Sequence, residues 1–346
     1  MSRSRPLPVF CILLALLGCG VITGLAVGAA TIPWTDLPAL FLHKLGLSGH
    51  EAPHALVFWE LRLPRVLLAV LVGATLSVAG AMMQGLFRNP LADPGLVGVS
   101  SGAALGAVVM IVLGERLVFL DFLRGPYLIP AAALLGAWMV TWLILQLGSS
   151  HGATSVATLL LAGIAINAFA GAIIGLCTFL ASDSQLRSLN FWMLGSLGAA
   201  SWSNLLLTLP FCLVLLIVAP STARALNALS LGESESAHLG FQPEHLKMGI
   251  ILLTSVGVGG CVAQTGMIGF VGLVVPHLLR LTIGPDHRWL LPCSAVLGAG
   301  LLVIADTLAR TVVAPAEMPI GIITAAVGAP FFLMLLWQQK KSISWV

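Results

Sequence analysis

Charged side chains are scarce in this sequence of 346 residues. Asp, Glu, Lys and Arg make up 8% of it, hydrophobic residues make up 58%, and the formal net charge is +3. A soluble globular domain carries about 25% charged residues, so the composition excludes that class and predicts an integral membrane protein. The small net charge, without a basic block, also argues against a nucleic-acid partner.

Motifs for catalysis and for metal binding are missing as well. The sequence has no GxxxxGK[ST] loop for nucleotide phosphates, and no HExxH, GxSxG or zinc-like Cys/His cluster. Its six cysteines stand singly in apolar runs, which predicts reduced, packed thiols. We therefore expect no enzyme activity, no bound cofactor and no metal site. If the protein is a pump, its energy enters from a partner chain.

Long uncharged runs dominate the sequence instead. A bilayer core about 30 Å thick needs roughly 20 apolar residues per helix, so the runs predict an all-α, polytopic protein. We expect a single transmembrane domain over 1–346, with a surface helix within 183–203 and a polar loop at 220–247. The expected crossings are 10–30, 64–87, 95–113, 126–147, 156–180, 205–219, 248–265, 269–284, 289–308 and 319–337.

Two sets of crossings share one pattern. One set is the second to fifth crossing and the other is the seventh to tenth. Each set contains an apolar helix, a Gly/Pro turn and a Gly-rich helix, but the first set starts outside the membrane and the second starts inside. This pattern predicts an inverted repeat, which in transporters places the pathway at the repeat interface. Lys and Arg are slightly more frequent in the loops on the side of both termini, which favours cytoplasmic termini.

Individual residues suggest local contacts. The GxxxG spacings at Gly102 and Gly106, and at Gly171 and Gly175, predict helix packing. Asp306 lies four residues before Arg310, which predicts an ion pair along one helix rather than a mid-membrane proton site.

The polar loop contains one helical pattern. Its sequence LGESESAHLG predicts a short helix with Ser230 or Ser234 as its cap, bounded by Gly232 and Gly240. A solvated amphipathic loop is the alternative.

Seven segments carry a resemblance to a known family. They are ELRLPR (60–65), GAMMQGLFRNPLADPGLVGVSSGAALG (80–106), LLLAGIAINA (159–168), LGESESAHLGF (231–241), GFVGLVVPHLLRL (269–281), DHRWLLP (286–292) and PIGIITAAVGAPFF (319–332). In their order they resemble the permease subunits of type II ABC importers for vitamin B12, ferric siderophores and haem, the BtuC/FecCD family. With QLRSLNFWMLGSLGAASW (185–202), the wording looks closest to haem permeases.

The resemblance implies a homodimer in the bacterial inner membrane, with ten helices per subunit. It also implies two ATPase subunits inside, which bind ATP and Mg²⁺, and a periplasmic substrate-binding protein outside. The expected function is ATP-driven transport of haem from periplasm to cytoplasm by alternating access. A ferric-siderophore or cobalamin permease is the alternative within the family, and an ion-coupled secondary carrier is the alternative outside it.

The resemblance also implies roles for individual residues. The residues that match the family's docking positions for the binding protein are Arg62, Arg65 and Arg310. Coupling to the ATPase falls to Leu231, Gly232, Glu233, Ser234, Ala237, His238, Leu239 and Gly240. The residues expected to form the cytoplasmic gate are Asn89, Pro90, Leu91, Ser155, Val156 and Ala157.

Other polar residues lie apart from these three groups. Candidate pathway groups are Gln84, Asn167 and Asn190, with interhelical hydrogen bonds as the stronger expectation. For the histidines His43, His50 and His54, which are expected in an outer loop, solvation is the stronger expectation than contact with an iron porphyrin.

Overall fold

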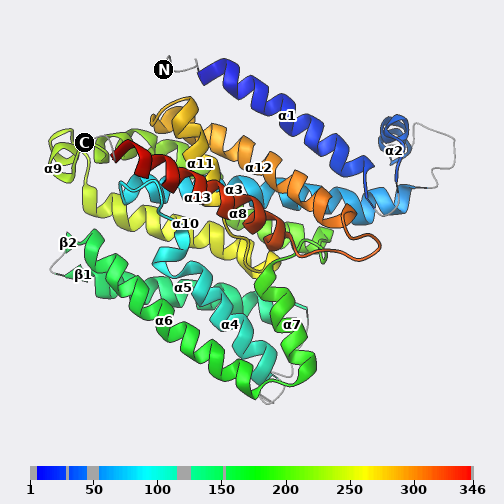
Figure 1. Cartoon of the computed structure of the whole chain (residues 1–346), viewed down its shortest axis with the longest axis horizontal. Coiled ribbons are helices and arrows are strands. Elements are labelled where there is room, and N and C mark those ends of the chain that lie inside the picture. The colour runs from blue at the N-terminus through cyan, green and yellow to red at the C-terminus, as the bar shows by residue number, and fades with distance from the viewer. Residues whose placement is uncertain (1–5, 29–30, 45–53, 115–125, 151–152, 344–346) are drawn as a thin grey trace.

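The computed structural model describes residues 6–28, 31–44, 54–114, 126–150 and 153–343. Within these ranges the chain is helical apart from connecting segments and one small hairpin (Figure 1). The hairpin pairs β1 (Ser149–Ser150) with β2 (Ala153–Thr154) in antiparallel register. The predicted all-α class is confirmed.

Ten described helices correspond one to one with the ten predicted crossings. Seven are long and apolar enough to span a membrane: α1 (Pro6–Ala26), η2 with α3 (Val57–Arg62 and Leu63–Leu86), α5 (Leu128–Gly148), α6 (Val156–Leu180), α8 (Trp202–Leu229), α10 (Pro243–Thr265) and α12 (His287–Thr311). The three shorter apolar helices are α4 (Val99–Leu113), α11 (Val271–Thr282) and α13 (Ile320–Ile343), whose apolar part ends at Met334. The remaining elements are η1 (Trp34–Asp36), α2 (Leu37–Lys44), η3 (Pro94–Val97), α7 (Asp183–Leu194) and α9 (Glu233–His238).

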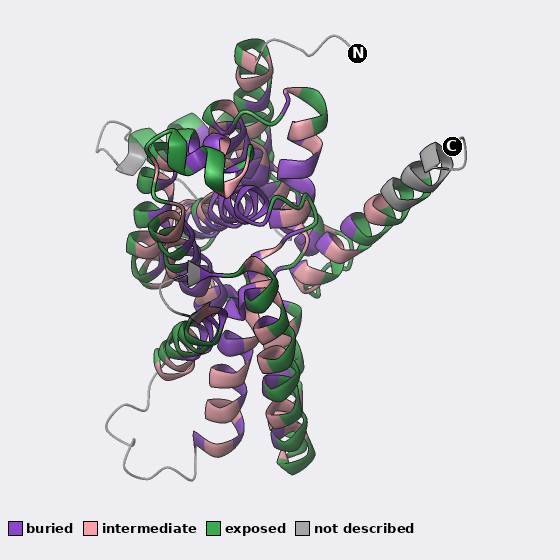
Figure 2. Cartoon of the chain, turned by 90° about the vertical axis from the view of Figure 1, so that its left-hand side faces the viewer, coloured by how far each residue is buried: buried purple, intermediate pink, exposed green. Residues whose placement is uncertain are grey.

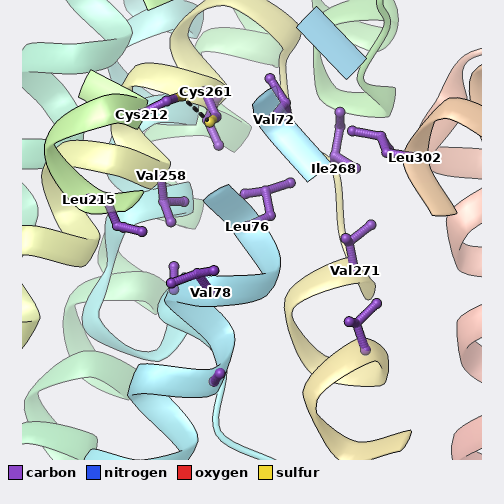
Figure 3. Packing of buried hydrophobic residues seen from close by; sticks show 14 of the residues in the cluster. Val72, Leu76, Val78, Cys212, Leu215, Val258, Cys261, Ile268, Val271 and Leu302 are labelled. Atoms are coloured by element: carbon purple, nitrogen blue, oxygen red, sulfur yellow. Dashed lines mark hydrogen bonds between the residues drawn. The ribbon is translucent and has the colours of Figure 1, made fainter. Parts of the chain in front are cut away.

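Helix α3 forms the centre of the bundle. It packs against α8, α10, α11 and α12, whereas α4, α5 and α6 pack together beside α10. Figure 3 shows Val72 and Leu76 of α3 among apolar side chains such as Val258, Val271 and Leu302. In Figure 2 this central helix is mostly buried, while α13 projects away from the bundle.

Four cysteines match the prediction of packed thiols and two do not. Cys177, Cys212, Cys261 and Cys293 are buried, and the Sγ atoms of Cys212 and Cys261 lie 3.4 Å apart (Figure 3). Cys11 and Cys19 are exposed on α1, because this helix packs on the bundle along a narrow stripe only.

Glycine allows the closest helix contacts. A Cβ added to Gly80 of α3 would lie 1.7 Å from the carbonyl oxygen of Gly272 in α11, so only glycine fits there. Gly102 likewise approaches the backbone of Gly136, and the prediction of packing for the first GxxxG spacing is confirmed.

The second GxxxG spacing behaves differently. A Cβ added to Gly171 or Gly175 of α6 would meet nothing within 4 Å. The prediction that these glycines pack a helix is therefore wrong within this chain. Their spacing alone does not bring a partner, because this face of α6 is turned away from the other described helices.

The start of the second crossing needs correction. The crossing was expected to begin at Pro64. Pro64 does lie in the first turn of α3, but the π-helical turn η2 precedes it, so the helix begins at Val57. The wider π turn offers room for a proline ring and does not need the missing amide in an α-type hydrogen bond. Helix and proline are thus compatible here.

The sixth crossing also extends further than expected. Helix α8 runs from Trp202 to Leu229 through Pro210 and Pro220, so the predicted loop at 220–247 is wrong at both of its ends. The non-helical stretch is interrupted by α9 and finishes where α10 begins at Pro243. Pro220 did not mark the end of the helix, because a long helix can continue through a proline when neighbouring helices hold the helix in place.

The two ends of the bundle carry different elements. We call the end with α9, the β1–β2 hairpin and the loop 87–93 the α9 end, and the end with η2, α7 and the last turn of α12 the arginine end. Phe10 of α1 and Trp289 of α12 have ring centroids 6.5 Å apart at the α9 end. The start of α1 and the end of α13 therefore lie on the α9 side (Figure 1).

Helices α4 and α11 support the predicted inverted repeat. Each is the short second helix of its set, and each follows a residue with left-handed backbone. These residues are Gly98, with φ of 82°, and Phe270, with φ of 68°. Short helices at corresponding positions of two halves are typical of inverted-repeat transporters.

Candidate functional site

Three arginines predicted to act together do lie together. Arg62 of η2, Arg65 of α3 and Arg310 of α12 meet at the arginine end, with exposures of 5%, 9% and 6%. Since α3 begins where the antiparallel α12 ends, residues far apart in sequence become neighbours. The structure brings the three side chains together, whereas contact with a binding protein stays a prediction.

A buried carboxylate lies between two of these arginines. Arg65 donates from Nε to Oδ1 of Asp306 at 3.0 Å, and Arg310 Nε lies 3.1 Å from Oδ2 of the same residue. The predicted pair between Asp306 and Arg310 is confirmed, with Arg65 as an additional partner. Arg65 also donates from Nη1 to Glu317 at 2.9 Å, and Glu317 keeps about half of its side chain exposed. Two acidic groups therefore hold one arginine.

The other contacts of the cluster join it to α1. Arg62 Nη1 donates to the carbonyls of Leu25 and Ala26 at 2.8 and 2.7 Å, and Arg310 Nη2 donates to that of Gly24 at 3.0 Å. These are last-turn carbonyls of α1, which have no partner within their helix. Cations also interact favourably with the negative end of the helix dipole. The arginines thus have a structural role that sequence reasoning did not assign.

At the α9 end, the first predicted gate segment is a tight turn. Asn89 Oδ1 accepts a hydrogen bond from the amide of Leu91 at 2.9 Å, and the Leu91 side chain is 42% exposed. Asp93 then accepts from the Gly95 amide at 2.7 Å and begins η3. Burial raises the pKa of the Asp93 carboxyl, and this hydrogen bond opposes the rise.

The second predicted gate segment begins α6. Ser155 is its N-cap, and its Oγ accepts from the Thr158 amide at 3.3 Å. Val156 and Ala157 form the first turn, with Ala157 exposed. The β1–β2 hairpin precedes this cap and connects it to α5. The structure thus places both gate segments at the same end, while their action as a gate stays a prediction.

The predicted coupling residues surround one short helix. Helix α9 spans Glu233–His238, between Gly232 with φ of 135° and Gly240 with φ of 86°. The predicted helix and its glycine boundaries are confirmed. Leu231 and Leu239 flank it with 68% and 60% of their surface exposed.

The serine cap predicted for this helix is wrong. Ser230 closes α8, where its hydroxyl donates to the Asn227 carbonyl at 2.6 Å, and Ser234 lies inside α9. Gly232 takes the N-cap position without a side-chain bond. A glycine with positive φ reverses the chain more sharply than a serine would allow.

The candidate pathway residues separate into two kinds. Gln84 is buried and donates to the Leu273 carbonyl at 3.1 Å. Asn167 donates to the Gly95 carbonyl at 3.2 Å and accepts from Ser101 at 2.5 Å. The expected interhelical bonds are therefore present, whereas Asn190 is exposed on α7. A role of these residues in a pathway stays a prediction.

No metal site is visible in the part of the chain that the structure describes. Groups of three His, Cys, Asp or Glu side chains suited to one ion are absent there. Of the three histidines expected in an outer loop, His43 stands in α2 instead, His54 lies before η2, and His50 falls outside the described residues.

Sequence reasoning overlooked three residues with contacts at these ends. Glu317 had no assigned role, although it follows Arg310 closely in sequence. Lys247 and Glu244 stand in the first turns of α10 and contact each other at 2.6 Å. Their i,i+3 spacing was a usable signal for that pair, but their other partners come from distant segments.

Comparison with known proteins agrees with this architecture. The model of the FecCD transport family matches residues 13–338, and the chain belongs to this family. It is 50% identical over 292 residues to the hemin transport system permease protein HmuU of Yersinia pestis, covering 83% of this chain and 85% of that protein. It is 41% identical to the vitamin B12 import system permease protein BtuC of Vibrio cholerae, covering 88% and 90%.

A solved structure gives the same result for the fold. A metal-chelate type ABC transporter in an inward-facing conformation superposes with a TM-score of 0.83 at 30% identity, covering 96% of this chain and 99% of that chain. The chain is therefore a multi-pass permease of the ABC-importer type, as the resemblance implied.

The buried carboxylate gives a prediction about stability. Asp306→Asn should lower the free energy of unfolding by about 3 kcal/mol, because Arg65 and Arg310 would lose their shared buried counter-charge. Glu317→Gln is the matched control and should cost less than about 1 kcal/mol, since Glu317 is half exposed. Thermal unfolding in detergent measures both. Equal losses for the two variants would contradict the assignment.

Proposed function

We propose that this chain is the permease of an ATP-driven importer that moves haem from the periplasm to the cytoplasm. The observation that carries the proposal is 50% identity over 83% of the chain to a hemin permease, against 41% to the vitamin B12 permease of Vibrio cholerae and 40% to the cobalamin permease of Halobacterium salinarum. The chain acts as a homodimer in the bacterial inner membrane, with both termini and the α9 end in the cytoplasm.

The α9 end suits an ATPase partner. Leu231 and Leu239 stand exposed beside a short helix that projects from the bundle at this end (Figure 1). Large exposed apolar side chains beyond a membrane span are typical of a protein interface. ATP and Mg²⁺ bind to two ATPase subunits there, and this chain carries the translocation pathway only.

The arginine end suits an acidic binding protein. Arg65 is held on its solvent side by Glu317, which an incoming carboxylate can replace as a partner. Charge pairs at the rim of an interface orient docking more than they add affinity. Arg62 and Arg310 add positive charge beside this position, so the cluster attracts a partner with paired glutamates.

Alternating access connects these partners. Docking of the binding protein outside and ATP-driven closure of the ATPase inside stabilise different states of the same dimer. Each event therefore shifts the population between the two states. The turn at Asn89, Pro90 and Leu91 and the start of α6 at Ser155, Val156 and Ala157 form the cytoplasmic gate. Asn190, exposed on α7, is a pathway group together with polar atoms of Gln84 and Asn167.

Uptake by liposomes tests the cargo. The dimer, reconstituted with its ATPase and binding protein, should take up haem in the presence of ATP and lose this uptake without ATP. Preference for a ferric siderophore or for cobalamin would overturn the haem assignment and keep the importer. Uptake that survives ATP depletion but collapses with the proton gradient would indicate a secondary carrier instead.

Capture of the ATPase tests the α9 end. Leu231→Ser together with Leu239→Ser should weaken binding of the ATPase at least about tenfold, since burying one leucine stabilises a complex by about 1.5–3 kcal/mol. Leu281→Ser is the matched control, because Leu281 is 63% exposed at the end of α11. Titration of the detergent-solubilised permease with the ATPase gives the affinities. An unchanged affinity of the double variant would refute this docking surface.

Docking of the binding protein tests the arginine end. Glu317→Gln should tighten docking several-fold at low salt, because Glu317 then no longer competes for Nη1 of Arg65, while Asp306 keeps its pair with Nε and Nη2. The gain should shrink as salt screens the exposed charge. Glu60→Gln, at an exposed carboxylate of η2, controls for the change in net charge. If both variants dock alike, Arg65 is not a docking residue.

A further inference from the structure

A buried lysine lies where α9, α10 and the β1–β2 hairpin meet. Lys247 is 1% exposed, although it stands in the second turn of α10, close to the helix start. Its Nζ donates to the Thr154 carbonyl at 2.5 Å and lies 2.6 Å from Glu244 and 3.1 Å from Glu233. A lysine has three N–H donors, and three acceptors from three segments use all of them.

The peptide of Thr154 is held from both sides by α10. Glu244 Oε2 accepts from the Thr154 amide at 2.6 Å, while Lys247 binds the carbonyl of the same residue. The next residue is Ser155, the N-cap of α6. A displacement of the Lys247 side chain therefore moves the backbone at the start of α6 directly.

Glu233 connects this lysine to the other gate segment. It is the first residue of α9, and its Oε2 contacts Lys247 while its Oε1 lies 4.0 Å from Nη2 of Arg88. Arg88, with φ of 49°, directly precedes the turn that begins at Asn89. One carboxylate on α9 thus reaches both segments assigned to the gate.

We propose that Glu233 and Lys247 are positioning residues that link the ATPase-docking helix to the gate. When the ATPase moves α9, Glu233 carries Lys247 and Arg88 with it, and these move the start of α6 and the turn at 89–91 together. This inference rests on the proposed function, since it requires that α9 binds an ATPase and that these segments close the pathway.

The burial of Lys247 explains why this link is firm. Lys247 is 1% exposed, so solvent screens its ionic contact with Glu233 less than it screens a surface pair, although Glu244 and Thr154 keep the lysine paired when Glu233 moves. The contact of Glu233 with Arg88 is more exposed, with 38% and 45% of the two side chains accessible. The connection from Glu233 through Lys247 to the start of α6 is therefore the stronger one, and the more exposed contact between Glu233 and Arg88 adds to it.

Glu233→Gln tests the link without removing the buried charge. The variant keeps Lys247 bound to Glu244 and Thr154, so the protein folds, but α9 loses its ionic contact with the gate. In liposomes with the ATPase and binding protein, haem uptake per ATP hydrolysed should fall about fivefold or more, the size of a typical coupling energy between sites. An unchanged ratio would overturn the proposal.

Glu235→Gln is the matched control. It removes the same charge from the same helix, but Glu235 is exposed and lies outside the cluster. A defect in ATPase docking lowers hydrolysis and uptake together, so the ratio should stay constant in this variant. If Glu235→Gln lowers the ratio as much as Glu233→Gln, the effect belongs to the charge of α9 in general and the proposal fails.

A second readout follows the gate itself. Leu91 is 42% exposed, so a cysteine placed there by Leu91→Cys can react with a maleimide, and its labelling rate reports access to the gate. The labelling rate of the unsubstituted protein, which has the exposed Cys11 and Cys19, is subtracted as background. ATP should change this rate in the parent and not in the Glu233→Gln background. An ATP-dependent change of equal size in both would refute the link.

Failure of the proposed function would look different. In that case the unmodified dimer would bind no ATPase, or ATP would drive no uptake, and the variants would have nothing to alter. Lys247→Met extends the test, because it should lower the uptake per ATP further than Glu233→Gln. If Lys247→Met does not assemble, the Glu233→Gln comparison alone decides.

Discussion

The cost of placing a charge in hydrocarbon organises this structure. Charged residues are few, and within the part of the chain that the structure describes, ten apolar helices lie between clusters of ion pairs at the two ends of the bundle. At one end Asp306 is enclosed by Arg65 and Arg310, and at the other Lys247 is enclosed by two glutamates. Each cluster joins helices that are distant in sequence, so the same constraint that removes charge from the middle also fixes how the ends are assembled.

Between these ends, packing depends on small residues. Van der Waals contact and interhelical hydrogen bonds hold membrane helices together, since lipid is as apolar as the helix surface. Gly80 and Gly102 bring backbones close enough for this contact, and Gln84 adds a hydrogen bond from α3 to α11. The open face at Gly171 and Gly175 shows the converse, a small-residue face of α6 without a neighbouring helix in this chain.

Composition and hydropathy were sufficient to predict the ten crossings, because apolar length is a local property. Element ends were harder: Pro64 and Pro220 look like boundaries, yet a π turn and a long helix accommodate them. Family resemblance assigned Arg62, Arg65 and Arg310 to one docking role, but neither their gathering nor their burial was predicted, since α12, Glu317 and the end of α1 reach them through the fold. The roles of Lys247 and Glu244 were missed for the same reason, as their partner Thr154 is 93 residues from Lys247 in sequence.

Helix α3 offers a direct connection between the two ends. Arg65 stands near its start, and Arg88 follows its end by two residues, with a buried helix between them. A helix that is packed on all sides moves as a rigid unit, because its neighbours leave no room for bending. In the proposed mechanism, exchange of partners at Arg65 would shift α3 and so reach Arg88 and its contact with Glu233. The proposed docking outside and the proposed ATPase movement inside would then act on one common element, and coupling between distant sites requires an element that both sites bias.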